Sequence, residues 1–468
     1  MGRETKLVKN TLILSIGSFF PKVTSLITLP ILTAMLSKEE YGTYDLVGVL
    51  VSLLLPVATL QIQSAAFRFL IESRDSRERS NQIVSNIFAI TIPISVLMVI
   101  ALYVVFGKLT ILCRLFVCLY FFFDILEISL LQIARGFSEN RAYSVASILL
   151  SLVNMGLTVA FVLWMRTGLT GVMCSLALAS SIATIYLILV VRKHVKVSPK
   201  YISIPLMKEM LAYSWPMVFN NLSRWALSTS DRLVITSFLG IEANAIYAVA
   251  TKLPNLLSTL QSTFSMAWQE NASLAVKDND TTLYYSKMFD AFFCFLSGML
   301  AILIAGTPVL FTVLIRGDYK EAYLQMPILY MGMLFDGMAA FLGGIYVAKK
   351  RTKSIGITTV VAATINLVID VALVKRIGIT AGSISTLISY LFLMIYRMLD
   401  INKIQKMKYN YLKLITVFAA MVLMCYLCWL QTRFSSIVNV IIGAVVFVVP
   451  NKEIIRSFGK VVTGKIRR

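Results

Sequence analysis

The sequence predicts an all-α integral membrane protein of about 14 transmembrane helices, arranged as two pseudo-symmetric six-helix lobes plus two C-terminal helices. Composition is the first observation: 58% of the 468 residues are hydrophobic and 14% are charged. The second is that apolar runs long enough to cross a bilayer recur from end to end. The third is a weak internal repeat. A soluble chain of this composition would need one giant core, whereas chains of this length normally split into several domains.

The apolar runs define the predicted spans. They lie at 11–36, 43–63, 82–106, 109–134, 143–165, 169–191, 210–239, 243–267, 288–315, 323–348, 355–374, 377–397, 411–431 and 435–450. The first run, "LILSIGSFFPKVTSLITLPILTAML", is too long for the apolar core of a signal peptide, and no small-residue cleavage motif follows it. We therefore expect it to remain as the first span.

Basic residues set the predicted orientation. The chain has 44 Lys and Arg against 23 Asp and Glu, for a net charge of +21. With the N-terminus inside, most of the basic residues fall in cytoplasmic segments, as the positive-inside rule requires. Both termini are therefore predicted to be cytoplasmic. The clusters at 192–200, 349–353 and 403–408 are interpreted as topology signals beside anionic membrane lipids, and no nucleic acid partner is expected.

Loop lengths exclude most enzymes. The predicted outer loops have only a few residues each, and the cytoplasmic segments at 64–81, 192–209 and 398–410 are too short to fold alone. Any function must therefore be performed by the helix bundle, so we expect no enzyme and no catalytic residue. The six cysteines lie in apolar runs and the single histidine, His194, lies in a basic loop, so neither a metal site nor a cofactor is expected.

Two pairs of segments repeat. "LSKEEYGTYDL" (36–46) matches "LGIEANAIYAV" (239–249) at three positions separated by 203 residues, Leu36/Leu239, Glu39/Glu242 and Tyr44/Tyr247. The stretch 144–171 also resembles 355–382, with Asn154 and Asn366 in mid-span. The repeat predicts a 1–191 N-terminal lobe, a 192–209 basic linker, a 210–397 C-terminal lobe, two more helices in 411–450 and a 451–468 basic tail. Repeated lobes around a central site are typical of transporters.

Charges inside the spans suggest a site for an anion. In "SWPMVFNNLSRWALSTSDRLVITSFLG" (214–240), polar residues recur at three- and four-residue steps and form one stripe, namely Asn220 or Asn221, Arg224, Ser228, Asp231 and Arg232. An Arg or Asp at mid-bilayer costs roughly 2.5–3.5 kcal/mol, so the stripe must face water or other helices. Together with Lys22 and Lys252, these residues predict a cationic, water-filled cleft between the lobes.

Three acidic residues are candidates for ion coupling or for ion pairing. Asp124 and Glu127, in "FFFDILEISL", are three residues apart and share one helix face. They could carry a proton, or they could form a buried ion-pair network with Arg114 or Lys22. Asp231 is about 10 Å from Arg224 along the helix axis, too far for an ion pair, so it should pair near Arg232 or with another helix.

The chain resembles the polysaccharide transporter, or Wzx-type flippase, branch of the MOP exporter superfamily. The likeness is carried by 10–46, 214–269, 341–356 and 365–390, and within 214–269 by Pro216, Asp231–Arg232, Leu239–Gly240, Tyr247, Lys252–Leu253–Pro254 and Ala267–Trp268. The resemblance implies two six-helix lobes and transport of undecaprenyl-pyrophosphate-linked oligosaccharide to the outer leaflet of the bacterial cytoplasmic membrane. Alternating access coupled to an H⁺ or Na⁺ gradient is also implied.

The resemblance fits the predicted cationic cleft, because Arg and Lys bind pyrophosphate and acidic sugars well. The candidate substrate-binding residues are Lys22, Asn220, Asn221, Arg224, Arg232 and Lys252. Lys at position 22 supplies a point charge without the fork of an arginine. A functional monomer is expected, with membrane lipids around it and an association with polysaccharide polymerase machinery left open.

Three other functions are weighed. A lipid II flippase shares the fold and the cationic cleft but favours a denser set of arginines than the first span offers. A multidrug antiporter of the same superfamily usually has twelve spans and acidic cavities, which Asp124 and Glu127 keep in consideration. A membrane glycosyltransferase or polymerase would need catalytic acids in a sizeable loop, and the loop holding Asp318 and Glu321 is too small.

Overall fold

The computed structural model describes residues 3–73, 76–277 and 280–452, and among them it contains helices and connecting turns but no strand. Most of the predicted basic tail, residues 453–468, lies outside the described residues. The chain divides into two compact units, Met1–Trp225 (unit 1) and Ala226–Arg468 (unit 2). The sequence placed the start of the second lobe at residue 210, and the structure divides the chain later, inside a continuous helix.

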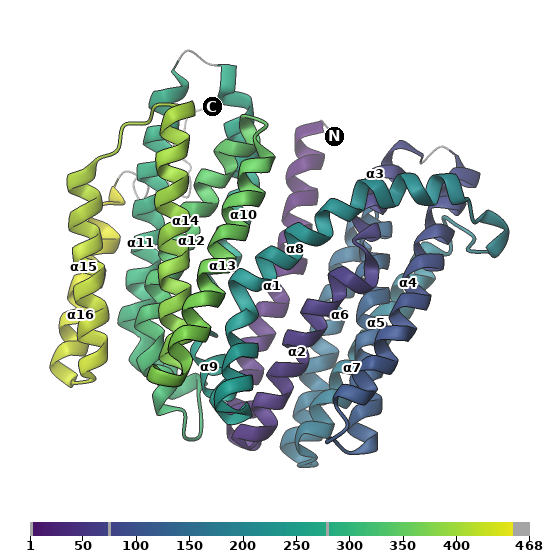
Figure 1. Ribbon diagram of the computed structural model, residues 1–468, viewed down its shortest axis with the longest axis horizontal. Coiled ribbons are helices and arrows are strands. Elements are labelled where there is room, and N and C mark those ends of the chain that lie inside the picture. Colours follow the sequence, from purple (N-terminus) through teal and green to yellow (C-terminus); the bar gives the residue numbers. More distant parts are fainter. Residues whose placement is uncertain (1–2, 74–75, 278–279, 453–468) are drawn as a thin grey trace. The chain divides into compact units, whose positions relative to one another are not determined.

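Unit 1 consists of helices that pack in pairs (Figure 1). They are α1 (Arg3–Met35), α2 (Lys38–Thr59), α3 (Ile62–Glu72), α4 (Arg77–Val105), α5 (Ile111–Gly136), α6 (Asn140–Thr158), the π-helical turn η1 (Val159–Trp164), α7 (Gly168–Val191), the 3₁₀ turn η2 (Pro199–Tyr201) and the first part of α8 (Ile204–Leu239). The closest packing is between α5 and α7, and α1 packs on α6.

Unit 2 continues from α8. It contains α9 (Ile241–Ala250), α10 (Leu256–Leu274), the 3₁₀ turn η3 (Ala275–Lys277), α11 (Thr281–Leu314), α12 (Lys320–Ala348), α13 (Thr352–Ile377), α14 (Thr380–Ile404), α15 (Tyr411–Leu430) and α16 (Arg433–Val448). Helices α12 and α14 pack most closely, and the yellow hairpin of α15 and α16 lies against α11 (Figure 1).

The helices confirm an all-α membrane fold. Nine of the described helices are long and apolar enough to cross a membrane, and Phe19–Met35, Ile241–Ala250 and Arg433–Val448 are shorter apolar helices. The described residues contain sixteen α-helices. Without the short α3, and with α9 and α10 counted as one interrupted span, fourteen segments remain. They lie close to the fourteen positions predicted from hydropathy. Large hydrophobic side chains such as Leu97 and Val104 are exposed, as on a surface that faces lipid.

Prolines have opposite effects in different spans. Seven of them, Pro21, Pro30, Pro56, Pro93, Pro216, Pro308 and Pro327, lie inside continuous helices. The predicted single span 243–267 is wrong, because the structure ends α9 at Ala250 and begins α10 at Leu256. Pro254 lies in this break, where it lacks an N–H donor and disfavours helical geometry at Leu253.

A second difference concerns the segment after α2. The span predicted at 43–63 ends at Thr59, where Leu60 and Gln61 adopt left-handed backbone angles with φ of 47° and 55°. The following segment, predicted only as a short cytoplasmic connection, contains α3. One face of α3 is apolar and buries Ile62 and Leu70 against α4 and α5, so tertiary packing stabilises this short helix.

Candidate functional site

The predicted polar stripe lies on α8, and its members differ in burial. Asn220, Arg224 and Ser228 are exposed, whereas Asp231 is only 3% exposed. The border between the compact units falls between Trp225 and Ala226. Asn220, Asn221 and Arg224 therefore belong to unit 1. The other stripe residues, Ser228, Asp231 and Arg232, belong to unit 2.

The remaining cationic candidates occupy three different positions. Lys22 is exposed on α1 of unit 1. In unit 2, Arg232 is half-buried and its Nη2 donates to Oγ1 of Thr251 at 2.8 Å. The half-buried Lys252 lies next to Thr251 in the turn between α9 and α10. The break in this span thus places Arg232 and Lys252 beside the same turn.

Asp231 belongs to a buried polar cluster in unit 2. Its Oδ2 accepts hydrogen bonds from the Tyr247 hydroxyl at 2.8 Å and from Thr386 Oγ1 at 2.6 Å, while Oδ1 has no hydrogen-bond partner among the described residues. Gly382 allows this approach, because a Cβ there would lie 3.0 Å from the Tyr247 ring. Asp231 was predicted to pair either near Arg232 or with another helix. Its hydrogen bonds in the structure are to residues of other helices, α9 and α14.

Two further residues of α13 complete the cluster. Asn366 and Asp370 are both 0% exposed and lie four residues apart, hence on one helix face. Asn366 Nδ2 donates to Oγ of Ser385 at 3.4 Å, and its Oδ1 accepts from Ser230 Oγ at 3.4 Å. Both oxygens of Asp370 lack a hydrogen-bond partner in the described part of the chain. Its charge is close enough to Asp231 for the two to repel each other.

This cluster has the chemistry of a cation or proton site. A buried carboxylate without a partner is expensive in a membrane span, at roughly 2.5–3.5 kcal/mol for Asp. A bound proton or a hard monovalent cation would remove that cost, and carboxylate, amide and hydroxyl oxygens are the ligands such cations prefer. The sequence singled out Asp231 but did not predict that Asp370 lies close to it. The available signal was "NLVID", which places Asn366 and Asp370 one turn apart.

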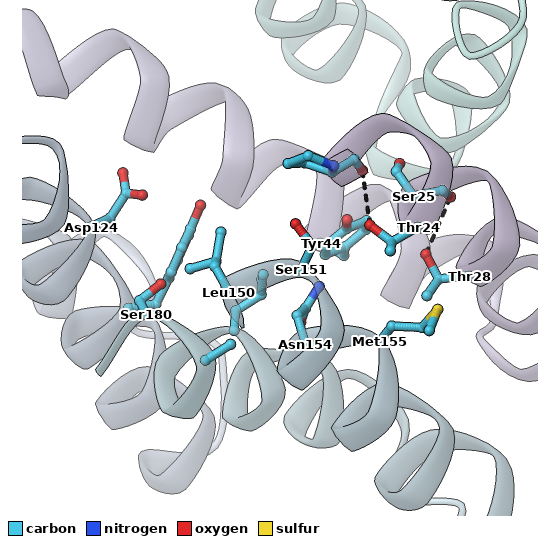
Figure 2. A pocket seen from close by; sticks show the side chains of 14 residues that line it. Thr24, Ser25, Thr28, Tyr44, Asp124, Leu150, Ser151, Asn154, Met155 and Ser180 are labelled. Carbon is cyan, nitrogen blue, oxygen red and sulfur yellow. Dashed lines mark hydrogen bonds between the residues drawn. The ribbon is translucent and has the colours of Figure 1, made fainter. Parts of the chain in front are cut away.

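Unit 1 contains a polar cavity of about 140 Å³ (Figure 2). Helices α1, α2, α5, α6 and α7 each contribute to its lining, which combines hydroxyl groups, one amide and one carboxylate. The polar lining residues are Thr24, Ser25, Thr28, Tyr44, Tyr120, Asp124, Ser151, Asn154 and Ser180. The sequence singled out Asp124 and Asn154, but not the serines and threonines that accompany them.

Asp124 and Glu127 were predicted either to carry a proton or to form ion pairs. Glu127 is 4% exposed, and Asp124 is half-buried at the cavity wall. Neither forms a hydrogen bond or an ion pair with another described residue. The suggested partner Arg114 instead lies over the Tyr103 ring, 4.7 Å from its centroid. The ion-pair interpretation therefore finds no support in the described residues.

Conventional metal or redox chemistry is not indicated elsewhere in the described residues. They contain no group of three or more His, Cys, Asp or Glu side chains that could hold a metal ion. Cys425 and Cys428 are free thiols that contact the Pro327 carbonyl and the Tyr323 hydroxyl. His194 stacks on Phe137, with Nε2 at 3.2 Å from Glu139 Oε1.

A family model described as "Polysaccharide biosynthesis protein" matches residues 7–269, more than half of the chain. The chain belongs to this polysaccharide biosynthesis family. The matched range includes unit 1 from residue 7 onward and continues through unit 2 to residue 269, within α10. The resemblance inferred from the sequence, to a polysaccharide transporter of the MOP superfamily, is thereby confirmed.

Solved structures share the fold of this family member at low sequence identity. The lipid II flippase MurJ, in an inward closed conformation, is similar with a TM-score of 0.69 and 13% identity, over 96% of this chain and 99% of that one. An inward-facing multidrug resistance MATE family transporter of the MOP superfamily gives 0.70 and 11%, over 83% and 98%.

A third similar structure is a MOP superfamily transporter from Pyrococcus furiosus, described as having a binding pocket of reverse polarity. It gives a TM-score of 0.58 and 14% identity, over 84% of this chain and 95% of that one. No curated protein matches the sequence. At these identities the solved structures establish the fold alone: this is a multi-pass membrane protein with the transporter fold of flippases and drug exporters.

Proposed function

We propose that this protein is a flippase that moves undecaprenyl-pyrophosphate-linked oligosaccharide repeat units from the inner to the outer leaflet of the bacterial cytoplasmic membrane. The translocated units would serve surface polysaccharide biosynthesis, as O-antigen, capsule or exopolysaccharide. The observation that carries this proposal is the polysaccharide biosynthesis family model over 7–269, in a chain with the fold of a lipid flippase. Transport by alternating access, without catalysis, is the mechanism this fold supports best.

The substrate would be recognised through its negative charge. Lys22 and Arg224 are exposed on α1 and α8, within stretches predicted to cross the membrane, and lipid is a poor environment for either. We assign the pyrophosphate to these two cations, with Asn220 and Asn221 on the turn of α8 before Arg224 as hydrogen-bond donors to phosphate or sugar. Arg232 and Lys252, beside the turn at Thr251, would provide a second cationic contact.

Cation binding at Asp231 and Asp370 would drive the return of the empty carrier. Movement of negative charge outward across an inside-negative membrane is favoured by about 2.3 kcal/mol per charge per 100 mV, so the loaded step needs no further energy source. H⁺ and Na⁺ both fit the oxygen-rich cluster. If transport is electrogenic in this way, an imposed potential changes its rate. A flux that ignores the potential would contradict this coupling.

One alternative substrate is favoured by a specific observation. The lipid II flippase structure matches 96% of the chain, and lipid II also carries a pyrophosphate. Both substrates would use the same cations and would differ in their glycans. We propose that the protein acts as a monomer with both termini in the cytoplasm, and that any polymerase machinery would act on the flipped product.

Translocation in vesicles tests the proposal. Inverted membrane vesicles would be loaded with fluorescent undecaprenyl-pyrophosphate glycan, and crossing would be measured for the native protein and for Arg224→Ala. Loss of a charge-assisted contact worth about 1.5–3 kcal/mol should slow crossing by about tenfold or more. Arg433→Ala is the matched control, because Arg433 is exposed at the start of α16. If the glycan crosses at the same rate with both variants, Arg224 is not part of the anion site.

A further inference from the structure

The cavity of unit 1 is rich in hydrogen-bond acceptors. Three hydroxyl groups of its wall, those of Thr24, Thr28 and Ser151, donate their protons to backbone carbonyls of their own helices, at 3.0, 3.2 and 2.7 Å. Their oxygen lone pairs remain for a ligand. Asp124 adds a carboxylate, and Asn154 adds an amide oxygen that is buried without a hydrogen-bond partner in the described part of the chain. The cavity therefore favours a ligand that brings several donors.

One hydroxyl group of the wall is unsatisfied. Ser180 lines the cavity from α7 and is 1% exposed, yet its Oγ has no hydrogen-bond partner among the described residues. A hydroxyl left without a partner in an interior is unfavourable, so water or a ligand should satisfy it. Because a hydroxyl both donates and accepts, it matches another hydroxyl group in either direction. Ser180 is thus an independent indication of a polar occupant.

The size of the cavity suits one small ring. Its volume is about 140 Å³. An engineered protein cavity of about 150 Å³ binds benzene, so there is room for one six-membered ring but not for two. In Figure 2 the polar side chains are spread along the lining, from Asp124 at one end to Thr28 at the other. A hard metal cation needs oxygen ligands that converge on one point, whereas the hydroxyl groups of a sugar ring point in several directions.

Charge in the lining disfavours an anion. Asp124 is the only acidic residue among those that line the cavity, and Lys and Arg are absent from this lining. An ionised phosphate only accepts hydrogen bonds, so it would meet a like charge and a wall of other acceptors. A neutral hydroxyl instead forms a short, strong hydrogen bond to a carboxylate. The chemistry of the wall thus selects an uncharged ligand with many hydroxyl groups.

The lining also offers apolar surface. Tyr44 and Tyr120 contribute aromatic rings, and Leu150, Met155 and Leu176 contribute aliphatic groups. The faces of a sugar ring carry C–H groups, which need apolar contact, while its edge carries hydroxyl groups. A tyrosine provides both kinds of contact, since its ring is apolar and its tip is polar. Polar and apolar parts of the lining therefore both match a pyranose.

We propose that the unit 1 cavity binds one uncharged sugar ring, held by hydrogen bonds to Asp124, Asn154 and Ser180. This inference rests on the proposed flippase function and adds to it a subsite for a single sugar of the substrate. Lys22, to which we assign the pyrophosphate, directly follows the lining residue Pro21 on α1. The sugar in the cavity is therefore the one joined to the pyrophosphate, and the cavity selects substrates by this first sugar.

Binding of two lipids to the purified full-length protein tests the site. One is the undecaprenyl-pyrophosphate glycan, the other is undecaprenyl pyrophosphate without a sugar, and both carry a fluorophore on the isoprenoid chain. Loss of one neutral hydrogen bond, in Asn154→Ala or Ser180→Ala, should raise the Kd of the glycan lipid about two- to tenfold. Asp124→Asn removes a charged acceptor and should raise it about tenfold or more. None of these variants should weaken binding of the sugar-free lipid.

Ser147→Ala is the matched control. Ser147 lies one turn before Ser151 on α6, donates to the Tyr143 carbonyl at 3.1 Å and does not line the cavity. Its replacement should leave both Kd values unchanged. The melting temperature of each variant identifies unfolding, and Ser180→Ala, which removes one atom, decides the matter if Asp124→Asn does not fold. Equal weakening of both lipids, or an unchanged Kd of the glycan lipid in Asn154→Ala and Ser180→Ala, would overturn the sugar site and leave the flippase proposal standing.

Free sugars separate failure of the site from failure of the proposed function. Saturation-transfer NMR would record contact of the native protein with glucose, galactose and N-acetylglucosamine in the absence of any lipid. Signals that weaken in Asn154→Ala and Ser180→Ala but not in Ser147→Ala support the cavity. If they do so while the native protein translocates no glycan, the flippase proposal alone fails. A native protein that binds neither the glycan lipid nor any of the three sugars overturns the site.

Discussion

Asn154 in unit 1 and Asn366 in unit 2 occupy matching positions of the internal repeat, but their surroundings differ. Asn154 lines a cavity together with hydroxyl groups, and its Oδ1 has no hydrogen-bond partner in the described part of unit 1. Asn366 is fully buried and is hydrogen-bonded to Ser230, Ser385 and Thr386. One amide therefore belongs to an open polar space and the other to a closed network.

The difference extends to the acidic residues. The 203-residue separation of the first repeat relates Asp231 of unit 2 to Thr28 of unit 1, which lines the cavity. Unit 2 thus has its acids on the helices that carry the repeat, whereas unit 1 has Asp124 and Glu127 on α5. The comparison indicates that a repeated helical framework can retain one amide while its charges are placed on different helices. We expect the closed network to contribute more to stability than the residues of the open cavity do.

The largest expected effect is that of Asp231→Ala. It removes the acceptor of two buried donors, Tyr247 and Thr386, and each unsatisfied donor costs about 1–3 kcal/mol. The free energy of unfolding in detergent, measured by thermal or denaturant melting, should therefore fall by about 2–6 kcal/mol. The matched change in unit 1 is Thr28→Ala. It removes only a local bond to the Ser25 carbonyl and should cost about 1 kcal/mol or less. Equal losses would mean that the two interiors are equivalent.

A smaller difference is expected between the two asparagines. Asn366→Ala leaves buried hydroxyl groups without their amide partner, and should lower the unfolding free energy by about 1–3 kcal/mol. Asn154→Ala should change it by less than about 1 kcal/mol, because water in the cavity can replace the amide. The same melting measurement applies. A greater loss for Asn154→Ala would show that unit 1 contains the more tightly bonded amide.

The smallest effect concerns a clamp found in unit 1. The Glu40 carboxylate accepts from the backbone N–H of Ser37 and of Leu169, both at 3.0 Å, and so caps the starts of α2 and α7 together. Gly168 permits this contact, since its φ is +58° and a Cβ there would overlap Glu40. The repeat places Ala243 at the equivalent position of unit 2.

Glu40→Ala should therefore lower the stability by about 0.5–2 kcal/mol, the usual range for loss of a helix cap. The neighbouring Glu39→Ala is the control, because Glu39 is exposed and its replacement should stay within about 0.5 kcal/mol. Limited proteolysis between α6 and α7 would report the loosened end directly. Identical behaviour of the two variants would exclude a stabilising clamp.

Hydropathy alone predicted the long helices well, because a bilayer requires about 20 apolar residues and leaves few alternatives. Helix α12 begins at Lys320 and ends at Ala348, against a prediction of 323–348. The break at 251–255 was missed, although the turn contains Lys252 and Asn255, because the residues on both sides are largely apolar and seven other prolines do not interrupt their helices. Local sequence does not distinguish a tolerated proline from one that ends a helix.

The candidate sites were less predictable than the helices. Charge in an apolar run was enough to select Asp124 and Asp231, because lipid cannot solvate either. The proximity of Asp231 to Asp370 was not predicted. It depends on contacts of α8 with α13 and α14, and these helices are far from α8 in the sequence. The hydroxyl groups that line the cavity together with Asp124 were missed for the same reason, as serine and threonine in membrane helices commonly bond to their own backbone.

The most direct test of the proposed function is substrate selection by the native protein in one vesicle preparation. Translocation would be measured side by side for fluorescent undecaprenyl-pyrophosphate oligosaccharide, fluorescent lipid II and a cationic dye. A polysaccharide flippase should move the oligosaccharide fastest and should not expel the dye. Preferred movement of lipid II would assign the protein to peptidoglycan synthesis, and expulsion of the dye without movement of either lipid would contradict the flippase function.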